Sequence, residues 1–136
     1  MGRTVRPENR WREVAVFPLK RVLVLDDDPG IQELLRLALE SEGYEVAVAK
    51  DGIDGLEALK QAAPDVIVVD LMMPRMDGIA FAHELERLKL RPRIPLLVLT
   101  AATRAAERAQ SMKAEGFVEK PFALQELLRQ VARLAA

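Results

Sequence analysis

Side chains that could do chemistry follow four of the short aliphatic runs in this sequence. In chain order these side chains are Asp26, Asp27 and Asp28, then Asp70, then Thr100, and finally Glu119 and Lys120. If these residues meet at one place, their carboxylates repel one another, because two unit charges about 4 Å apart interact by about 4 kcal/mol at an effective dielectric constant of about 20. The cluster therefore needs positive charge. The two candidates are a hard divalent cation and the Lys120 ammonium.

Magnesium suits these donors better than a transition metal does. The strand ends offer oxygen atoms, the chain has no cysteine, and its only histidine, His83, falls inside a predicted helix. A carboxylate beside Mg²⁺, a lysine and a threonine hydroxyl has what a phosphoryl acceptor needs. The cations neutralise the phosphoryl oxygens while the Asp70 oxygen attacks in line. The residues therefore predict covalent phosphorylation of Asp70.

The elements that must bring these residues together are short strands alternating with helices. Aliphatic runs predict strands at 21–25, 44–48, 66–69 and 96–99, with a weaker fifth at 116–118. Apolar spacing predicts helices at about 29–42, 53–63, 78–89, 103–113 and 123–135. Most of the runs lack polar alternation, which favours strands covered on both faces of a parallel sheet, and the less apolar run at 44–48 is expected at an edge. Five strand and helix pairs indicate a doubly wound α/β sheet, in which ligands bind beyond the carboxyl ends of the strands.

Local signals agree with this division. Asp28 followed by Pro29 is typical of a helix N-cap and first-turn proline, and Gly43 stands where a C-cap glycine belongs. The segment at 103–113 is rich in alanine and predicts a lightly held surface helix.

The composition limits the possible functions. The 136 residues, half of them hydrophobic, suit one domain with a real core. With 20 basic and 21 acidic residues the net charge is −1, so no overall charge attracts nucleic acid or an anionic membrane. No apolar run approaches the roughly 18 residues of a bilayer span, and the N-terminus lacks a signal-peptide core. We therefore expect a cytoplasmic protein, and the absence of cysteine excludes a thiolate zinc site.

Residues 1–19 stand outside the repeating pattern. They carry four arginines, the only tryptophan (Trp11) and a short apolar patch at 14–17. We interpret them as a flexible or loosely docked extension. The alternative is a partner-binding or dimer-forming arm anchored by Trp11 and Phe17.

Four motifs together resemble the receiver domain of bacterial two-component response regulators. They are VLDDDPG at 24–30, VVDLMMPRMDG at 68–78, LTA at 99–101 and EKPF at 119–122. Each motif alone is weak, but an acidic pair, an Asp followed by MPxMDG, a Thr and a Lys-Pro in this order form a specific signal. The resemblance implies a receiver domain at 20–136, preceded by the extension at 1–19. It also implies a flavodoxin-like (βα)5 three-layer sandwich with sheet order 2-1-3-4-5.

The resemblance implies a metal site around the phosphoacceptor. Asp70 is then the phosphoacceptor and a ligand of Mg²⁺, for which Mn²⁺ is a possible substitute. Asp27 is a direct ligand, Asp26 acts mainly through water, and the backbone carbonyl of Met72 is the third protein ligand. Asp28 falls outside the acidic pair, which agrees with its predicted capping role.

The resemblance also implies a switch. Thr100 is the hydroxyl that turns toward the phosphoryl group, and Lys120 pairs with that group. Phe117 is the aromatic side chain that moves inward with the threonine. The bond from Lys120 to Pro121 is often cis in this family, which aims the ammonium at the site.

The implied function is a phospho-accepting switch rather than an enzyme, with only self-phosphorylation from phosphodonors and autodephosphorylation. The implied partners are a histidine kinase or histidine phosphotransfer protein, which donates the phosphoryl group to Asp70, and a downstream protein target. Only 15 residues follow Pro121, so we expect no output domain on this chain and no direct contact with nucleic acid or membrane. A monomer or weak homodimer is expected.

Two alternatives stay open. A degenerate receiver would bind partners without phosphorylation. A haloacid-dehalogenase-type phosphohydrolase also uses a strand-end Asp with Mg²⁺, but Gly30 stands where that pattern has a hydroxyl or valine. The chain also departs from the usual receiver, because the interval from Thr100 to Lys120 is two residues shorter, so the usual dimer or output geometry is not carried over. His83 is assigned no chemistry.

Overall fold

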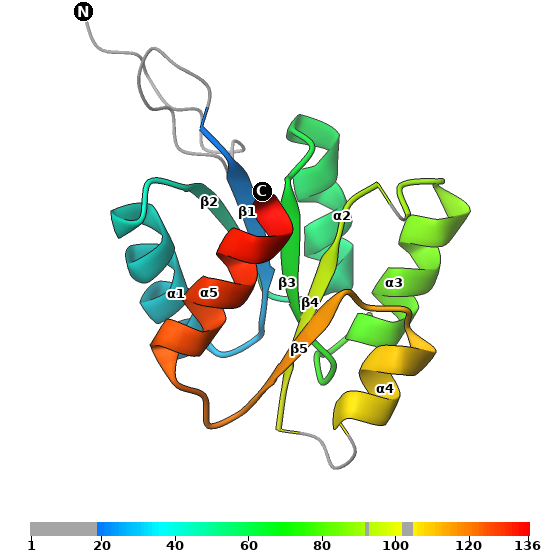
Figure 1. Cartoon of the computed structure of the whole chain (residues 1–136). Coiled ribbons are helices and arrows are strands. Elements are labelled where there is room, and N and C mark those ends of the chain that lie inside the picture. The colour runs from blue at the N-terminus through cyan, green and yellow to red at the C-terminus, as the bar shows by residue number, and fades with distance from the viewer. Residues whose placement is uncertain (1–18, 92, 102–104) are drawn as a thin grey trace, which may run out of the picture.

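A parallel sheet organises the part of the chain that this computed structural model describes, residues 19–91, 93–101 and 105–136. Within these residues the strand order is β2-β1-β3-β4-β5 (Figure 1). The strands are β1 (Arg21–Leu25), β2 (Glu45–Ala49), β3 (Val66–Asp70), β4 (Leu96–Thr100) and β5 (Gly116–Glu119). All neighbouring strands are parallel, which confirms the doubly wound sheet and its predicted order.

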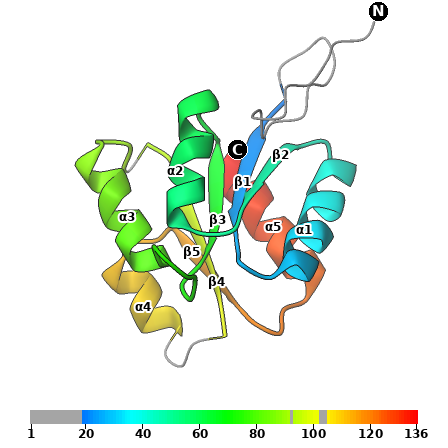
Figure 2. The same ribbon diagram turned by 180° about the vertical axis from the view of Figure 1, so that it is seen from behind.

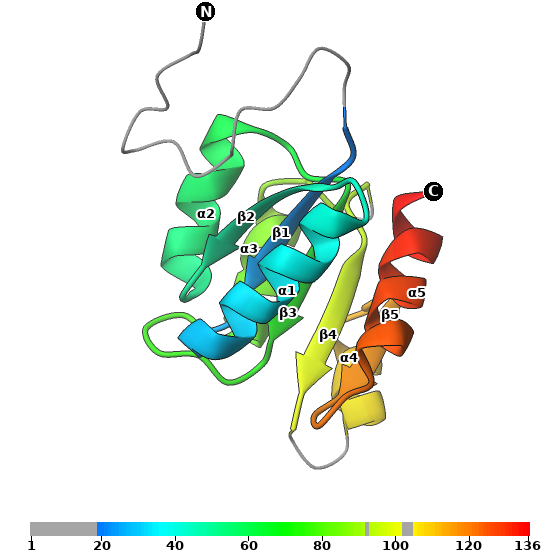
Figure 3. The ribbon, with the colours of Figure 1, turned by 90° about the vertical axis from the view of Figure 1, so that its left-hand side faces the viewer.

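Helices cover both faces of the sheet (Figures 1 and 2). The helices are α1 (Pro29–Ser41) and α5 (Leu124–Ala135) on one face, and α2 (Gly52–Gln61), α3 (Gly78–Arg87) and α4 (Ala105–Ser111) on the other. The side view in Figure 3 shows α2 and α5 on opposite sides of the strands. These three layers confirm the flavodoxin-like sandwich that the resemblance implied.

Alternate strand residues supply two separate cores. In β1, Val22 and Val24 pack with α1 and α5, whereas Leu23 and Leu25 pack with the helices of the opposite face. All four side chains are buried. Burying each such side chain stabilises the fold by about 1.5–3 kcal/mol. The unbroken aliphatic runs therefore reflect helices on both faces, as predicted.

The predicted ends of the first helix are confirmed. The Asp28 carboxylate accepts hydrogen bonds from the amides of Gly30 and Ile31 and so caps α1. Gly43 has φ of 95°, a left-handed conformation that glycine adopts without a steric cost. The chain can therefore leave α1 and turn directly into β2.

The edges of the sheet also agree with the sequence. β2 forms one edge, as its less apolar run predicted, and β5 forms the other. No helix of the described chain has the length and hydropathy that a bilayer span requires.

Some predictions fall partly or wholly on residues that are not described. The helix expected at 103–113 is described from Ala105, and Trp11 and Phe17 lie outside the described residues. The interpretation of the N-terminal extension therefore stays a prediction.

Candidate functional site

A cluster of carboxylates lies at the carboxyl ends of β1 and β3. Leu25 pairs with Val69 in the parallel register, so the next residues along the chain, Asp26 and Asp70, are neighbours. Asp26 is 0% exposed and Asp70 is 5% exposed, whereas Asp27 is exposed to solvent. Each of these three residues offers a carboxylate oxygen, and these oxygens lie within 4.8 Å of one another. The structure thus brings together the acidic residues that the sequence singled out.

Lys120 supplies positive charge to this cluster from the end of β5. Its Nζ donates hydrogen bonds to Asp26 Oδ2 at 2.8 Å and to Asp70 Oδ2 at 3.1 Å. Burial lowers the pKa of Lys120, but its bonds to the two carboxylates outweigh burial and raise the pKa above its usual range. The ammonium is therefore charged at neutral pH. The backbone amide of Lys120 donates to the Thr100 carbonyl at 3.0 Å, and the bond to Pro121 is cis.

Asp70 is incompletely compensated in spite of this lysine. Burial raises the pKa of Asp70, and the neighbouring Asp26 charge acts in the same direction. The amide of Met72, which donates to Asp70 Oδ1 at 3.1 Å, and the Lys120 ammonium oppose the rise but do not cancel it. One ammonium shared between two buried carboxylates therefore leaves negative charge that a further cation could neutralise.

Hydrogen bonds to the backbone and the side chain of Asp26 hold this residue in place. Its backbone amide donates to the Ala49 carbonyl at 3.0 Å, and its carbonyl accepts from Gln32 Nε2 at 2.5 Å. Its Oδ1 accepts from the amide of Asp28 at 2.9 Å. Asp28 itself turns to the start of α1, which confirms its role as a cap and separates it from the acidic cluster.

The loop from β3 to α3 approaches Asp70 closely. A Cβ atom at position 78 would lie 2.6 Å from the Asp70 carbonyl oxygen, so Gly78 leaves the space that this approach needs. The Gly78 amide donates to the Leu71 carbonyl at 3.1 Å. Asp77 caps α3 by accepting from the Ala80 amide at 2.9 Å. The turn and helix-start residues of the MPRMDG motif therefore close the loop against the end of β3.

Two residues of this region were missed by sequence reasoning. Asp51, which follows β2 and is 1% exposed, accepts a hydrogen bond from Arg75 Nε at 2.6 Å. Arg75 lies in the loop from β3 to α3, with φ of 62°. An Asp-Gly pair shortly after an aliphatic run was the available signal, but nothing in the spacing pointed to Arg75 as its partner.

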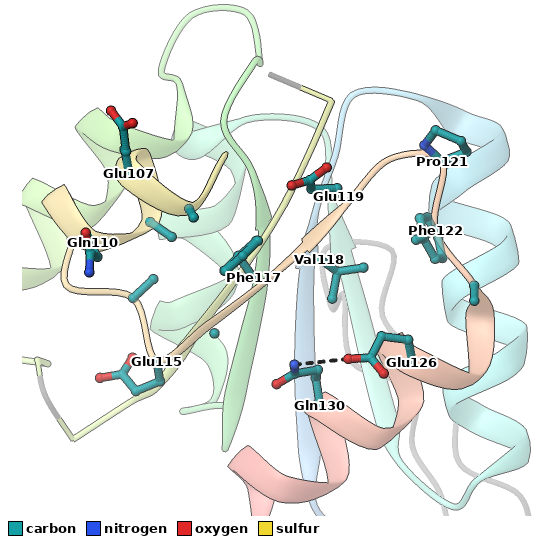
Figure 4. Close-up of a pocket in the computed structure, with 15 residues that line it drawn as sticks. Glu107, Gln110, Glu115, Phe117, Val118, Glu119, Pro121, Phe122, Glu126 and Gln130 are labelled. Atoms are coloured by element: carbon teal, nitrogen blue, oxygen red, sulfur yellow. Dashed lines mark hydrogen bonds between the residues drawn. The ribbon is translucent and has the colours of Figure 1, made fainter. Parts of the chain in front are cut away.

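The two predicted switch residues lie on adjacent strands and on the same face of the sheet, because Phe117 pairs with Val98, two residues before Thr100. Thr100 is fully buried at the end of β4, whereas Phe117 is 37% exposed on β5. Phe117 lines a groove between α4, β5 and α5, together with Phe122, Glu119 and Glu126 (Figure 4). Glu119 is the last residue of β5, next to Lys120, but it belongs to this groove rather than to the acidic cluster. The groove and the cluster thus share one strand, β5.

The donor set fits a hard divalent cation. Asp26, Asp27 and Asp70 present only carboxylate oxygens, and the described chain holds no other such group of three metal-ligating side chains. Mg²⁺ and similar ions prefer oxygen ligands and bind through one or two carboxylates with water completing the shell. The exposed Asp27 leaves the cluster open to solvent on one side.

Comparisons with known proteins agree with this geometry. The family model for the response regulator receiver domain matches residues 22–132. The response regulator MprA of Mycobacterium sp. (strain KMS) is 40% identical over 116 residues, which are 84% of this chain and 50% of that protein. The chain therefore spans about half the length of the curated relatives it matches.

Solved structures are similar over most of the chain. Chemotaxis protein CheY4 of Vibrio cholerae is 31% identical with a TM-score of 0.79, covering 86% of this chain and 99% of that one. Response regulator TrrA of Thermotoga maritima, solved in complex with Mg²⁺ and BeF, is 34% identical with a TM-score of 0.76, covering 85% of this chain and 99% of that one.

The sheet and its acidic edge define an α/β protein with a receiver-type site. The chain belongs to the response regulator receiver domain family of two-component systems. Receiver domains bind Mg²⁺ at an acidic pocket and interact with histidine kinases or phosphotransfer proteins and with downstream targets.

Proposed function

We propose that Asp70 accepts a phosphoryl group, in a Mg²⁺-dependent reaction, from a histidine kinase or histidine phosphotransfer protein. The observation that carries this proposal is the bond from Lys120 Nζ to both Asp26 and Asp70 beside the exposed Asp27. A buried carboxylate that is incompletely compensated suits a reaction that brings a cation and an anionic phosphoryl group to it. Family membership supports the same proposal.

The residues have distinct roles in this reaction. Asp27 and Asp70, with the Met72 carbonyl, would hold Mg²⁺ directly, and Asp26 would act through water. When bound, Mg²⁺ neutralises charge on the phosphoryl oxygens. An oxygen of Asp70 forms the new O–P bond as the N–P bond of the donor phosphohistidine breaks. The electron pair stays on that nitrogen, and the imidazole, protonated by solvent at its other ring nitrogen, leaves as a neutral base. Lys120 exchanges its bond to Asp70 for one to a phosphoryl oxygen.

The phosphoryl group would then be sensed by Thr100. Its hydroxyl turns toward the phosphoryl oxygens, and Phe117 moves from its exposed position into the space that the threonine leaves. Because Phe117 lines the groove of α4, β5 and α5, this movement changes a surface on which a downstream protein can dock. The unit that performs this function comprises residues 20–136, with residues 1–19 as an extension, and we propose a monomer or weak homodimer in the cytoplasm.

Intact-mass measurement after incubation with acetyl phosphate and Mg²⁺ tests the proposal. We expect the wild type to gain one phosphoryl group, and we expect no gain in Asp70→Asn or in the presence of EDTA. Asp28→Asn is the matched control, since it removes a nearby carboxylate that caps α1 while asparagine caps equally well, and it should be labelled like the wild type. Labelling of Asp70→Asn would contradict the assignment. No labelling of the wild type, from acetyl phosphate or from a phosphorylated histidine donor, would favour the degenerate receiver.

A further inference from the structure

The loop from β3 to α3 is tied at its apex to the start of α2. Arg75 Nε donates to Asp51 Oδ2 at 2.6 Å, and the Gly52 amide donates to the Met76 carbonyl at 2.9 Å. Two neighbouring residues at the apex of the loop are thus bound to Asp51 and Gly52 at the start of α2. These contacts join segments that are 24 residues apart in the sequence.

Asp51 is a rigid anchor for this contact. Its side chain is buried, and its Oδ1 accepts from the Asp54 amide at 2.8 Å, which caps α2. The second oxygen, Oδ2, is thereby aimed at the loop. A Cβ atom at position 52 would lie 2.5 Å from Met76 Cγ, so Gly52 lets the loop pack directly against the start of α2. The anchor therefore holds the loop through an ion pair, a backbone bond and close packing.

The backbone conformation of this loop is unfavourable at Arg75. Arg75 has φ of 62°, a left-handed conformation that is unfavourable for a residue other than glycine. The bond to the buried Asp51 carboxylate offsets that cost, because it joins two charged groups at 2.6 Å. Without the bond to Asp51, nothing would offset the unfavourable conformation of Arg75, and we expect the loop to leave it.

The same loop also contacts the acidic cluster. It begins after Asp70, and its second residue, Met72, donates its amide to Asp70 Oδ1. The Met72 carbonyl is the proposed third ligand of Mg²⁺, three residues before Arg75 in the chain. A shift at the apex therefore moves a ligand and a hydrogen-bond donor of the site.

We propose that Asp51 and Arg75 are a positioning pair, which holds the loop from β3 to α3 in the conformation that binds Mg²⁺ at Asp70. This proposal rests on the proposed function, since it concerns the metal that serves phosphorylation. Neither side chain contacts the acidic cluster in the described contacts, so the pair acts through the loop. Its loss should weaken Mg²⁺ binding in a chain that stays folded.

Mg²⁺ titration by calorimetry, without any phosphodonor, tests the pair in the full chain. Arg75→Asn removes the guanidinium but tolerates a left-handed backbone, and Asp51→Asn keeps the cap of α2. We expect each substitution to raise the Kd for Mg²⁺ by about tenfold, the low end of the loss found when groups that orient metal ligands are changed. The double variant should bind Mg²⁺ with a Kd no higher than that of the weaker-binding single variant, because each single substitution already removes the same contact. Arg75→Lys should restore part of the affinity.

Arg87→Gln is the matched control. It breaks an ion pair between Arg87 and Glu84 on the exposed surface of α3, far from the loop apex, and should leave the Kd unchanged. Urea unfolding of Arg75→Asn should show a larger loss of stability than this control, because the buried Asp51 carboxylate loses its guanidinium, but the variant should remain folded under the titration conditions. A Kd that stays at the wild-type value in both Arg75→Asn and Asp51→Asn overturns the positioning role, as does a double variant whose effect is the sum of the single effects.

The titration separates this proposal from the function on which it rests. If the wild type is labelled at Asp70 but the variants bind Mg²⁺ normally, the positioning pair is wrong and the phosphoacceptor stands. If the variants lose affinity while the wild type is never labelled, the pair positions a metal site and the phosphoacceptor is wrong. A wild type that binds no Mg²⁺ contradicts both.

Discussion

The ends of β2 and β3 each present a buried aspartate, and the two are opposite in their electrostatics. Burial raises the pKa of Asp51, but the hydrogen bonds from Arg75 and the Asp54 amide outweigh burial and hold the pKa below its usual range. Burial also raises the pKa of Asp70, and there the bonds from Met72 and Lys120 do not outweigh it. The same residue type is thus stabilised as an anion at one strand end and destabilised at the next.

The difference lies in how cations are shared. Within the described residues, Asp51 is paired with a guanidinium that bonds to no second carboxylate. Asp70 shares one ammonium with Asp26. The first arrangement serves the structure of the loop, and the second leaves charge available for chemistry. Negative charge that is incompletely compensated before binding favours the arrival of a cation, at some cost in stability.

Removing the whole Asp51 side chain should have the largest effect on stability. Asp51→Ala removes the cap of α2 and the bond from Arg75, whose exposed guanidinium stays solvated, so the free energy of unfolding should fall by about 1–2 kcal/mol. Urea denaturation followed by circular dichroism measures this loss. Asp51→Asn should lose less, because the cap remains. An Asp51→Ala protein as stable as the wild type would contradict the structural role given to Asp51.

Asp70→Asn should change stability in the opposite direction. The substitution removes a carboxylate whose charged form is disfavoured by burial, so we expect the free energy of unfolding to rise by about 1 kcal/mol at neutral pH. The same urea experiment, in EDTA so that no Mg²⁺ binds either protein, checks the sign. A marked loss of stability would show that Asp70 is compensated as well as Asp51 is.

The pH dependence of stability should separate the two aspartates more finely. The folded pKa of Asp70 is raised, so its destabilising effect is present above that pKa and disappears as the pH falls below the unfolded value of about 3.9. The folded pKa of Asp51 is lowered, so its stabilising effect is present above the unfolded value and is lost as the pH falls through the folded pKa.

Melting curves between neutral pH and about pH 3 can follow both effects. We expect the advantage of Asp70→Asn over the wild type to shrink as the pH falls, and we expect the disadvantage of Asp51→Asn to shrink in the same range. Differences that stay constant with pH would mean that the two substitutions act through packing rather than through charge.

The fold could be predicted well from the sequence because its signals are local. Aliphatic runs covered on both faces marked β1, β3 and β4, and Asp28 and Gly43 marked the ends of α1. The strand order came from the resemblance to receiver domains rather than from the pattern itself. Burial at the edge strands was less clear, since edge strands need less apolar surface.

The site was predictable only in part, because some of its contacts depend on the approach of distant segments. Asp26 and Lys120 directly follow their strands and Asp70 is the last residue of its strand, so the parallel sheet brings them to one edge. The pair of Asp51 and Arg75 depends on the path of a loop and on a left-handed residue, neither of which residue type reveals. The opposite burial of the adjacent Asp26 and Asp27 likewise follows from the turn that begins α1.

Locating the phosphoryl group chemically is the most direct test of Asp70 as the phosphoacceptor. After incubation with acetyl phosphate and Mg²⁺, borohydride reduces an aspartyl phosphate to homoserine, and peptide mass spectrometry identifies the converted residue. We predict homoserine at position 70 alone, and none in Asp70→Asn. Homoserine at Asp26, Asp27 or Asp51, or phosphate retained on His83, would contradict the central role given to Asp70.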